Sequence, residues 1–104
     1  MIDNFAGKTA VLTGAGSGFG LECARIGARL GMNLVLVDVQ QDALDAAAAE
    51  MQAAGSQVLA RKVDVSNAAQ MEQLAADVNA WRGEAAAFDD VTMLLVEAVV
   101  PGSQ

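Results

Sequence analysis

Two kinds of apolar pattern alternate along this chain of 104 residues. The first is a short apolar run bounded by turn-forming residues, which is typical of a strand buried on both faces of a parallel sheet. Such runs span residues 8–13, 33–38, 57–63 and 91–100. In the second pattern, apolar residues recur every three or four positions, which is the period of an amphipathic helix. Helices are therefore predicted over residues 18–30, 41–54 and 67–82.

Each predicted helix has an apolar stripe that is expected to face the sheet. In the first helix the stripe consists of Phe19, Cys23, Ile26, Gly27 and Leu30. In the other two it consists of Leu44, Ala47, Ala48 and Met51, and of Met71, Leu74, Ala75 and Val78 with Trp81 at its end. From these positions, Cys23 and Trp81 are interpreted as packing residues, not as a nucleophile and a platform for a stacked base.

The alternation of strands and helices predicts the fold class. Strands that alternate with helices of this length form βαβ units, so the chain is expected to be a single α/β domain over residues 1–104. Its parallel sheet should contain about four strands in the spatial order 3-2-1-4, flanked by three helices. The third strand carries the adjacent cations Arg61 and Lys62, so it is expected nearer to a sheet edge.

Composition narrows the possible functions. With 54% apolar but only 4% aromatic residues, the core must be built from aliphatic side chains. The net charge of −7 argues against nucleic acid or an anionic membrane as a partner. One cysteine and no histidine exclude an internal disulfide, a C-x-x-C pair and a histidine-based triad. The first residues lack the basic and apolar regions of a secretory signal, so a cytoplasmic location is expected.

The glycine-rich stretch between the first strand and the first helix, residues 13–20, carries the main candidate chemistry. Its alternating glycines leave backbone N–H groups almost bare, and those groups lie at a helix N-terminus, where an anion is stabilised. A bound diphosphate is therefore expected. The general fingerprint G-x-G-x-x-G is not met, because Phe19 or Leu21 stands where its third glycine should be.

The pattern that does fit is T-G-x-x-x-G-x-G, formed by Thr13, Gly14, Gly18 and Gly20. With the preceding strand, residues 7–13, it resembles the cofactor turn of the short-chain dehydrogenase/reductase family. The resemblance implies a Rossmann-like half that binds a nicotinamide dinucleotide. The cofactor-binding residues that it implies in the turn are Gly14, Gly16, Ser17, Gly18, Phe19 and Gly20.

An acidic residue ends the second strand. Asp38 lies 24 positions after Gly14, near the separation of about 20 residues expected for the carboxylate that binds the adenosine ribose. Such a carboxylate accepts hydrogen bonds from the ribose hydroxyls and repels a 2′-phosphate, which predicts NAD as the cofactor in preference to NADP. Val39 is included in the predicted site. Alternatively, Asp38 only caps the following helix.

The third strand is followed by Asp64 and Val65. In the short-chain dehydrogenases, an Asp at the end of the third strand and the residue after it meet the adenine ring, and the resemblance implies those roles for Asp64 and Val65. The alternative is that Asp64 and Ser66 cap the next helix.

The resemblance covers residues 5 to about 82 and fades after them. Where the family has an Asn-Asn-Ala-Gly-like motif after the fourth strand, this chain has residues 96–99, in which only Ala98 agrees. The family's proton transfer uses a Tyr, with a Lys four residues later and a Ser. This chain has no Tyr, and its only lysines, Lys8 and Lys62, come too early. No catalytic residue is assigned, and a dinucleotide-binding module without hydride-transfer activity is predicted.

Other interpretations stay open at this point. The chain could be a truncated, recombined or engineered dehydrogenase fragment with a structural or dimerisation role, or a natural small binding module. The tail, residues 83–104, diverges from the family, and residues 88–96 weakly resemble the closing strand of PP2C-type phosphatases. Asp89 and Asp90 could then bind Mg²⁺ or Mn²⁺, although a solvated turn is the commoner case. Pairing of two copies along the edge of the strand at 91–100 predicts a homodimer.

Overall fold

The computed structural model describes residues 6–82 and the backbone of residues 91–94. Its elements follow the predicted order along the chain. The strands are β1 (Thr9–Thr13), β2 (Asn33–Asp38), β3 (Val58–Lys62) and β4 (Val91–Leu94). The helices are α1 (Gly18–Arg29), α2 (Gln41–Ala53) and α3 (Ala68–Arg82). Apart from the C-terminal end of β4, where residues 95–100 lie outside the described part, the predicted bounds agree to within one residue.

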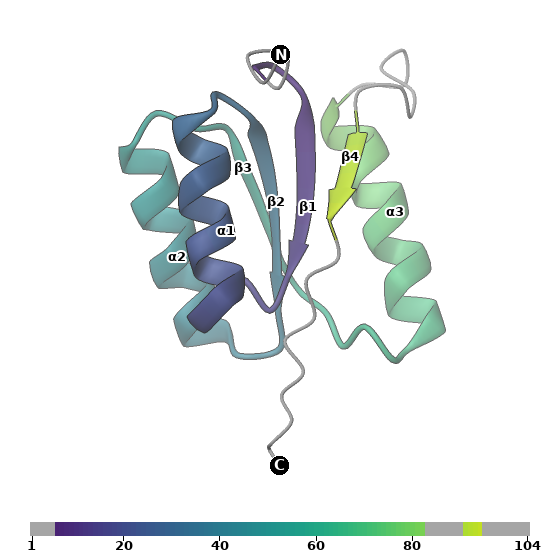
Figure 1. The fold of residues 1–104 in the computed structure, drawn as a ribbon. Coiled ribbons are helices and arrows are strands. Elements are labelled where there is room, and N and C mark those ends of the chain that lie inside the picture. The colour runs from purple at the N-terminus through teal and green to yellow at the C-terminus, as the bar shows by residue number, and fades with distance from the viewer. Residues whose placement is uncertain (1–5, 83–90, 95–104) are drawn as a thin grey trace.

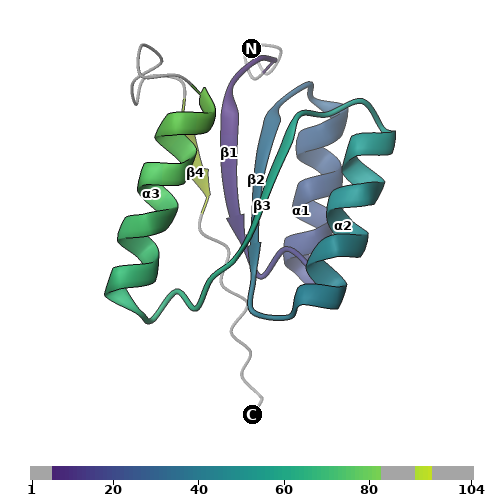
Figure 2. The same ribbon diagram turned by 180° about the vertical axis from the view of Figure 1, so that it is seen from behind.

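The described strands form one parallel sheet in the order β3-β2-β1-β4. The predicted α/β fold is confirmed, and β3 lies at one side of the sheet as expected. Helices α1 and α2 cover one face, and α3 covers the other (Figures 1 and 2). In the register, Thr13 pairs with Val37 and Asp38 pairs with Lys62. The carboxyl ends of β1, β2 and β3 therefore meet at the same edge.

The core consists of two apolar clusters, one on each face of the sheet. Residues Ala10 and Leu12 of β1 and Leu34 and Leu36 of β2 pack towards α1 and α2. The intervening residues Val11, Val35 and Val37 pack with Leu74 and Val78 of α3. Alternate side chains of a strand point to opposite faces, so both faces need apolar residues, and each fully buried leucine contributes roughly 2 kcal/mol. The continuous apolar runs of the sequence reflect this burial on both faces.

The prediction for the buried face of α1 is wrong in part. Of the predicted stripe, Gly27 is buried and Cys23 and Leu30 pack against the first cluster, but Phe19 is 69% exposed and Ile26 is 46% exposed. The other buried residues of the helix, Gly20 and Ala24, were not in the stripe. The cause is the close approach of the helix to the sheet: a Cβ added at Gly27 would lie 2.9 Å from Leu34 Cδ2. Only small residues fit at this contact, so the larger apolar residues lie beside it.

The other two helices follow the prediction more closely. In α2, Leu44, Ala47 and Met51 are buried and Ala48 is half-buried. In α3, Leu74 and Val78 are buried, but Ala75 is exposed, so its predicted inward position is wrong. Cys23 packs against the first cluster and Trp81 against the second, both half-buried. Their interpretation as packing residues therefore agrees with the structure.

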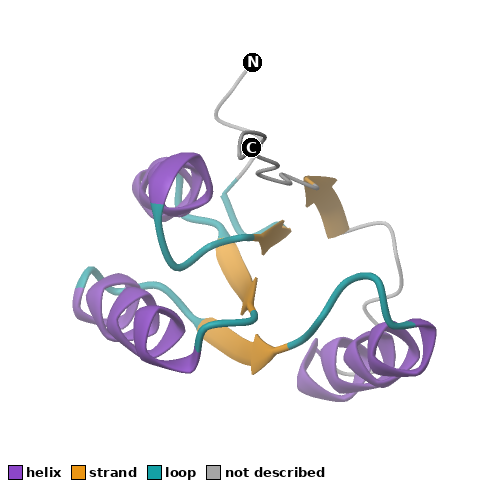
Figure 3. Ribbon diagram, turned by 90° about the horizontal axis from the view of Figure 1, so that it is seen from below, coloured by secondary structure: helices purple, strands orange, loops and turns teal. Residues whose placement is uncertain are grey.

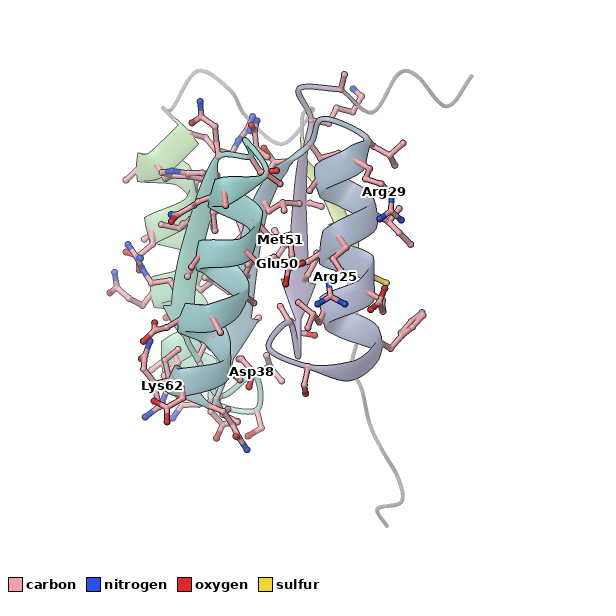
Figure 4. All side chains as sticks on the ribbon, turned by 90° about the vertical axis from the view of Figure 1, so that its left-hand side faces the viewer. Arg25, Arg29, Asp38, Glu50, Met51 and Lys62 are labelled. Atoms are coloured by element: carbon pink, nitrogen blue, oxygen red, sulfur yellow. The ribbon has the colours of Figure 1, made fainter. Side chains whose placement is uncertain are left out.

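An exposed cluster of charges joins α1 to α2. Arg25 forms an ion pair with Glu22 on its own helix, and its Nε donates a hydrogen bond of 2.7 Å to Glu50 Oε2 on α2. Figure 4 shows Arg25 and Glu50 pointing towards one another between the two helices. The hydrogen bonds with Glu50 and then Glu22 raise the pKa of Arg25, and the bond from Arg25 lowers the pKa of Glu50.

Several predictions concern parts of the chain that the structure does not describe. They are the Asp89–Asp90 metal site, the motif at 96–99 and the outer part of the strand at 91–100. Within the described residues, no helix is long and apolar enough to cross a membrane.

Candidate functional site

The ends of three parallel strands form a pocket at the carboxyl edge of the sheet, the edge seen in Figure 3. Its volume is about 160 Å³. The residues that line it come from the ends of β1, β2 and β3 and from the segments that follow, namely Thr13, Gly14, Val37, Asp38, Val39, Val63, Asp64 and Val65. Five of the predicted site residues therefore meet in one pocket: Gly14, Asp38, Val39, Asp64 and Val65.

The turn after β1 requires glycine for two different reasons. Gly14 and Gly18 have φ angles of +64° and +58°, in the left-handed region that other residues rarely adopt. Gly20 is required by a close approach, because a Cβ added there would lie 2.2 Å from the Gly14 carbonyl oxygen. The first turn of α1 is thus held directly against the backbone that leaves β1.

The N-terminus of α1 presents backbone donors. Ser17 is the N-cap residue, its backbone is extended, and its side chain makes no capping hydrogen bond. The first internal bond of the helix runs from Leu21 N–H to Ser17 C=O at 3.2 Å, so the amides of Gly18, Phe19 and Gly20 precede the helical ladder. The first turn contains no acidic residue. These donors and the helix dipole together favour an anion here.

Asp38 contacts the glycine turn directly. Its Oδ2 accepts a hydrogen bond of 2.8 Å from Gly16 N–H, and its Oδ1 accepts one of 2.9 Å from Gln40 N–H. The N-cap of α2 is Gln40, which makes no side-chain capping bond. The alternative interpretation of Asp38 as the cap of α2 is therefore wrong, because the carboxylate bonds the residue before the helix and the turn after β1.

Asp64 closes a local turn after β3. Its Oδ1 accepts hydrogen bonds from Ser66 N–H at 3.0 Å and from Ser66 Oγ at 2.7 Å, and these bonds lower the pKa of Asp64. The cap of α3 is a different residue, since Asn67 Oδ1 accepts a bond of 3.0 Å from Gln70 N–H. Because the hydrogen bonds from Ser66 lower its pKa, Asp64 keeps its negative charge to lower pH than a free aspartate.

The pocket combines apolar and acceptor groups. Val39 is 54% exposed and Val65 is 42% exposed, so both present apolar surface beside the carboxylates of Asp38 and Asp64. Flat, partly apolar groups that carry hydrogen-bond donors suit such a lining. Within residues 6–82 and 91–94, no group of three or more His, Cys, Asp or Glu side chains could hold a metal ion.

The remaining predicted site residues lie beside the pocket. Ser17, Gly18, Phe19 and Gly20 form the end of the turn and the start of α1, and Gly16 joins the pocket through Asp38. Sequence reasoning missed Gln40 and Ala43, which contact Asp38 and Gly16 respectively. It named Thr13 as part of the turn pattern but not as a site residue, and it missed Val37 and Val63, although their places at the ends of predicted strands were a signal.

The short chain dehydrogenase family model matches residues 8–95 of the chain. The chain belongs to this family. The match runs past Arg82, and it includes the glycine turn and the ends of β2 and β3. The predicted resemblance to the short-chain dehydrogenases is therefore confirmed.

Short-chain dehydrogenases with known activities are among the relatives. The galactitol 2-dehydrogenase (L-tagatose-forming) of Cereibacter sphaeroides is 48% identical over 75 residues, which are 71% of this chain and 28% of the relative. The 1-deoxy-11-beta-hydroxypentalenate dehydrogenase of Streptomyces exfoliatus is 44% identical over 68 residues, 65% of this chain and 25% of the relative. The chain thus spans about a quarter of the length of these dehydrogenases.

Solved structures of short-chain dehydrogenases share the fold. One from Burkholderia phymatum, in complex with NAD, is 51% identical with a TM-score of 0.70, over 72% of this chain and 27% of that protein. The L-sorbose reductase of Gluconobacter frateurii, complexed with NADPH and L-sorbose, is 36% identical with a TM-score of 0.72, over 77% of this chain and 31% of that protein. This short-chain dehydrogenase chain therefore belongs to the N-terminal, Rossmann-like half of the family fold.

Proposed function

We propose that this chain binds the adenosine diphosphate part of NAD(H) at the carboxyl edge of its sheet. The observation that carries the proposal is that Gly14 of the glycine turn, Asp38 and Asp64 all line the same pocket. Related structures hold NAD or NADPH, which supports a nicotinamide dinucleotide as the ligand class. The site is formed within one α/β domain, which we take to span residues 1–104.

The diphosphate is expected to bind at the turn between β1 and α1. Gly14 and Gly18 allow the backbone to turn sharply, and the amides of Gly18, Phe19 and Gly20 precede the helical ladder. Ser17 is exposed at the N-cap, and its side chain makes no capping hydrogen bond. Charge-assisted bonds from backbone amides to phosphate oxygens are about twice as strong as neutral ones. The turn can therefore hold an anion despite the net charge of −7.

The adenosine is expected to occupy the pocket between the ends of β2 and β3. Val39 and Val65 supply apolar surface for the adenine ring, and Asp64 supplies an acceptor for its amino group. The carboxylate of Asp38, which lines the same pocket, is expected to accept hydrogen bonds from the ribose hydroxyls. A hydrogen bond to a charged group contributes about 1.5–3 kcal/mol, and a 2′-phosphate would be repelled instead. We therefore propose that NAD(H) binds in preference to NADP(H), by roughly tenfold or more.

We also propose that this chain does not carry out hydride transfer by itself. It contains no tyrosine, and its only lysines are Lys8, just before β1, and Lys62, at the end of β3. Loss of a positioned proton donor costs on the order of 10² to 10⁴ in rate. A structural or dimerisation role of the chain and a metal-binding tail at Asp89–Asp90 stay predictions.

Isothermal titration of the chain with NADH and with NADPH tests the proposed function. NADH is expected to bind, and NADPH is expected to bind roughly tenfold more weakly. The variant Asp38→Ala should narrow this difference, because it removes the group that repels the 2′-phosphate. Asp42→Asn is the matched control: this exposed side chain of α2 lies outside the pocket. Absence of NADH binding at millimolar concentration, or tighter binding of NADPH, would overturn the proposal.

A further inference from the structure

The carboxylate of Asp38 does more in the fold than face the pocket. Its Oδ2 accepts the Gly16 N–H at 2.8 Å, across 22 positions of the sequence. Next to this bond, the Ala15 N–H donates to the Val37 carbonyl at 3.0 Å. The end of β2 therefore holds the glycine turn at two consecutive residues, once through its backbone and once through the side chain of Asp38.

Packing around Gly16 also joins the glycine turn to the end of β2 and to α2. A Cβ added at Gly16 would lie 2.7 Å from Ala43 Cβ and 2.9 Å from Asp38 Oδ2. Gly16 does not have a positive φ angle, so glycine is needed here for close approach and not for backbone freedom. The first turn of α2 thus lies against the turn after β1, and the other oxygen of Asp38 accepts the amide of Gln40 just before that helix.

We infer that Asp38 is a positioning residue for the diphosphate turn, in addition to its proposed contact with the ribose. Its bond to Gly16 holds the turn in the conformation in which the following amides point to one anion. A carboxylate has about four lone-pair sites, so two amide bonds leave acceptor capacity for the ribose. The inference rests on the proposed function, because it assumes that the turn binds a diphosphate.

The two roles of Asp38 predict opposite effects for a ligand that has no ribose hydroxyls. If Asp38 only bound the ribose, its removal would leave such a ligand unaffected or would favour it, because one negative charge near an anion is lost. If Asp38 positions the turn, its removal weakens binding of the same ligand. The nucleotide 2′,3′-dideoxy-ADP, compared with ADP, separates the two cases.

Hydrogen exchange of the ligand-free chain tests the contact itself. In Asp38→Ala the Gly16 amide loses its acceptor and is expected to exchange roughly tenfold faster or more. Asp38→Asn keeps a carbonyl oxygen that can accept from Gly16, so exchange should stay close to that of the unmodified chain. Asp42→Asn removes one neighbouring negative charge and should change nothing. An unchanged Gly16 amide in Asp38→Ala overturns the inference.

Calorimetric titration with both nucleotides tests the consequence for binding. Asp38→Ala should bind 2′,3′-dideoxy-ADP roughly five- to tenfold more weakly than the unmodified chain does. Asp38→Asn should bind this nucleotide at least as tightly as the unmodified chain, because it keeps an acceptor for the Gly16 N–H and loses the negative charge. If the alanine variant does not fold, Asp38→Asn is the variant that tests the inference. Unchanged or tighter binding by Asp38→Ala overturns the inference. If the unmodified chain binds no ADP, the proposed function fails, and amide exchange alone decides whether Asp38 holds the turn.

Discussion

Replacement of Gly20 by alanine should damage both the fold and the proposed site. The added Cβ would lie 2.2 Å from the Gly14 carbonyl oxygen, 2.7 Å from the Gly14 carbonyl carbon and 3.0 Å from the Thr13 carbonyl oxygen. A normal carbon–oxygen contact is about 3.3 Å or longer, so the nearest pair of atoms would overlap by roughly 1 Å. All three neighbours are backbone atoms, and they can move only if α1 moves away from the turn.

The expected size of the effect follows from two opposing contributions. Overpacking against a rigid neighbour lowers the free energy of unfolding by up to about 3 kcal/mol, and replacing glycine by alanine within a helix raises it by about 1 kcal/mol. The net loss of about 2 kcal/mol corresponds to a fall in Tm of about 8–16 °C for a domain of this size. Because the donors at the start of α1 shift with the helix, NADH binding should weaken roughly tenfold or more.

Thermal unfolding followed by far-ultraviolet circular dichroism, together with calorimetric titration of NADH, measures both effects. Gly55→Ala is the control: Gly55 follows α2 with a φ angle of +99° and has open space where a Cβ would lie. This variant should lose stability through backbone strain of about 1–3 kcal/mol but keep its affinity for NADH. A Gly20→Ala chain with unchanged Tm and unchanged NADH affinity would refute the close approach of α1 to the turn.

Three other outcomes are expected. Because the hydrogen bond from Arg25 lowers the pKa of Glu50, this exposed pair stabilises the fold above the usual pKa of a glutamate and ceases to do so as the pH falls through the lowered value. Glu50→Gln should therefore flatten the acid side of a Tm-against-pH curve, and an unchanged curve would contradict this. The chain should not oxidise NADH with carbonyl substrates; turnover that Gly14→Trp abolishes would contradict this. Sedimentation at tens of micromolar should show a homodimer, and a monomer would count against pairing along β4.

Several predicted site residues lie together in the structure because of a general property of parallel sheets. Residues that end or follow consecutive parallel strands lie at the same edge, so Gly14, Asp38 and Asp64 could be placed together from strand boundaries alone. The glycine spacing of the turn was equally informative. Gly14 and Gly18 have positive φ angles, a backbone requirement that appears directly in the choice of residue.

The prediction failed where contact distance decides the outcome. Periodicity placed Phe19 and Ile26 on the buried face of α1 and left out Gly20 and Ala24. In the structure Phe19 and Ile26 are exposed, and Gly20 and Ala24 are buried together with Gly27, which the prediction did include. Hydrophobic pattern carries no information about how near a helix lies to a sheet, whereas packing density excludes large side chains at a close contact.

The sequence by itself therefore determined the order of elements, the parallel sheet and the residues at its carboxyl edge, since these follow from local periodicity and turn chemistry. Only the tertiary structure decided how the elements hold one another. The bond from Gly16 to Asp38 and the contact of Gly16 with Ala43 join residues that are 22 or more positions apart. Such contacts depend on the positions that α1, α2 and the ends of β1 and β2 take when they pack together, and no local pattern in the chain encodes those distances.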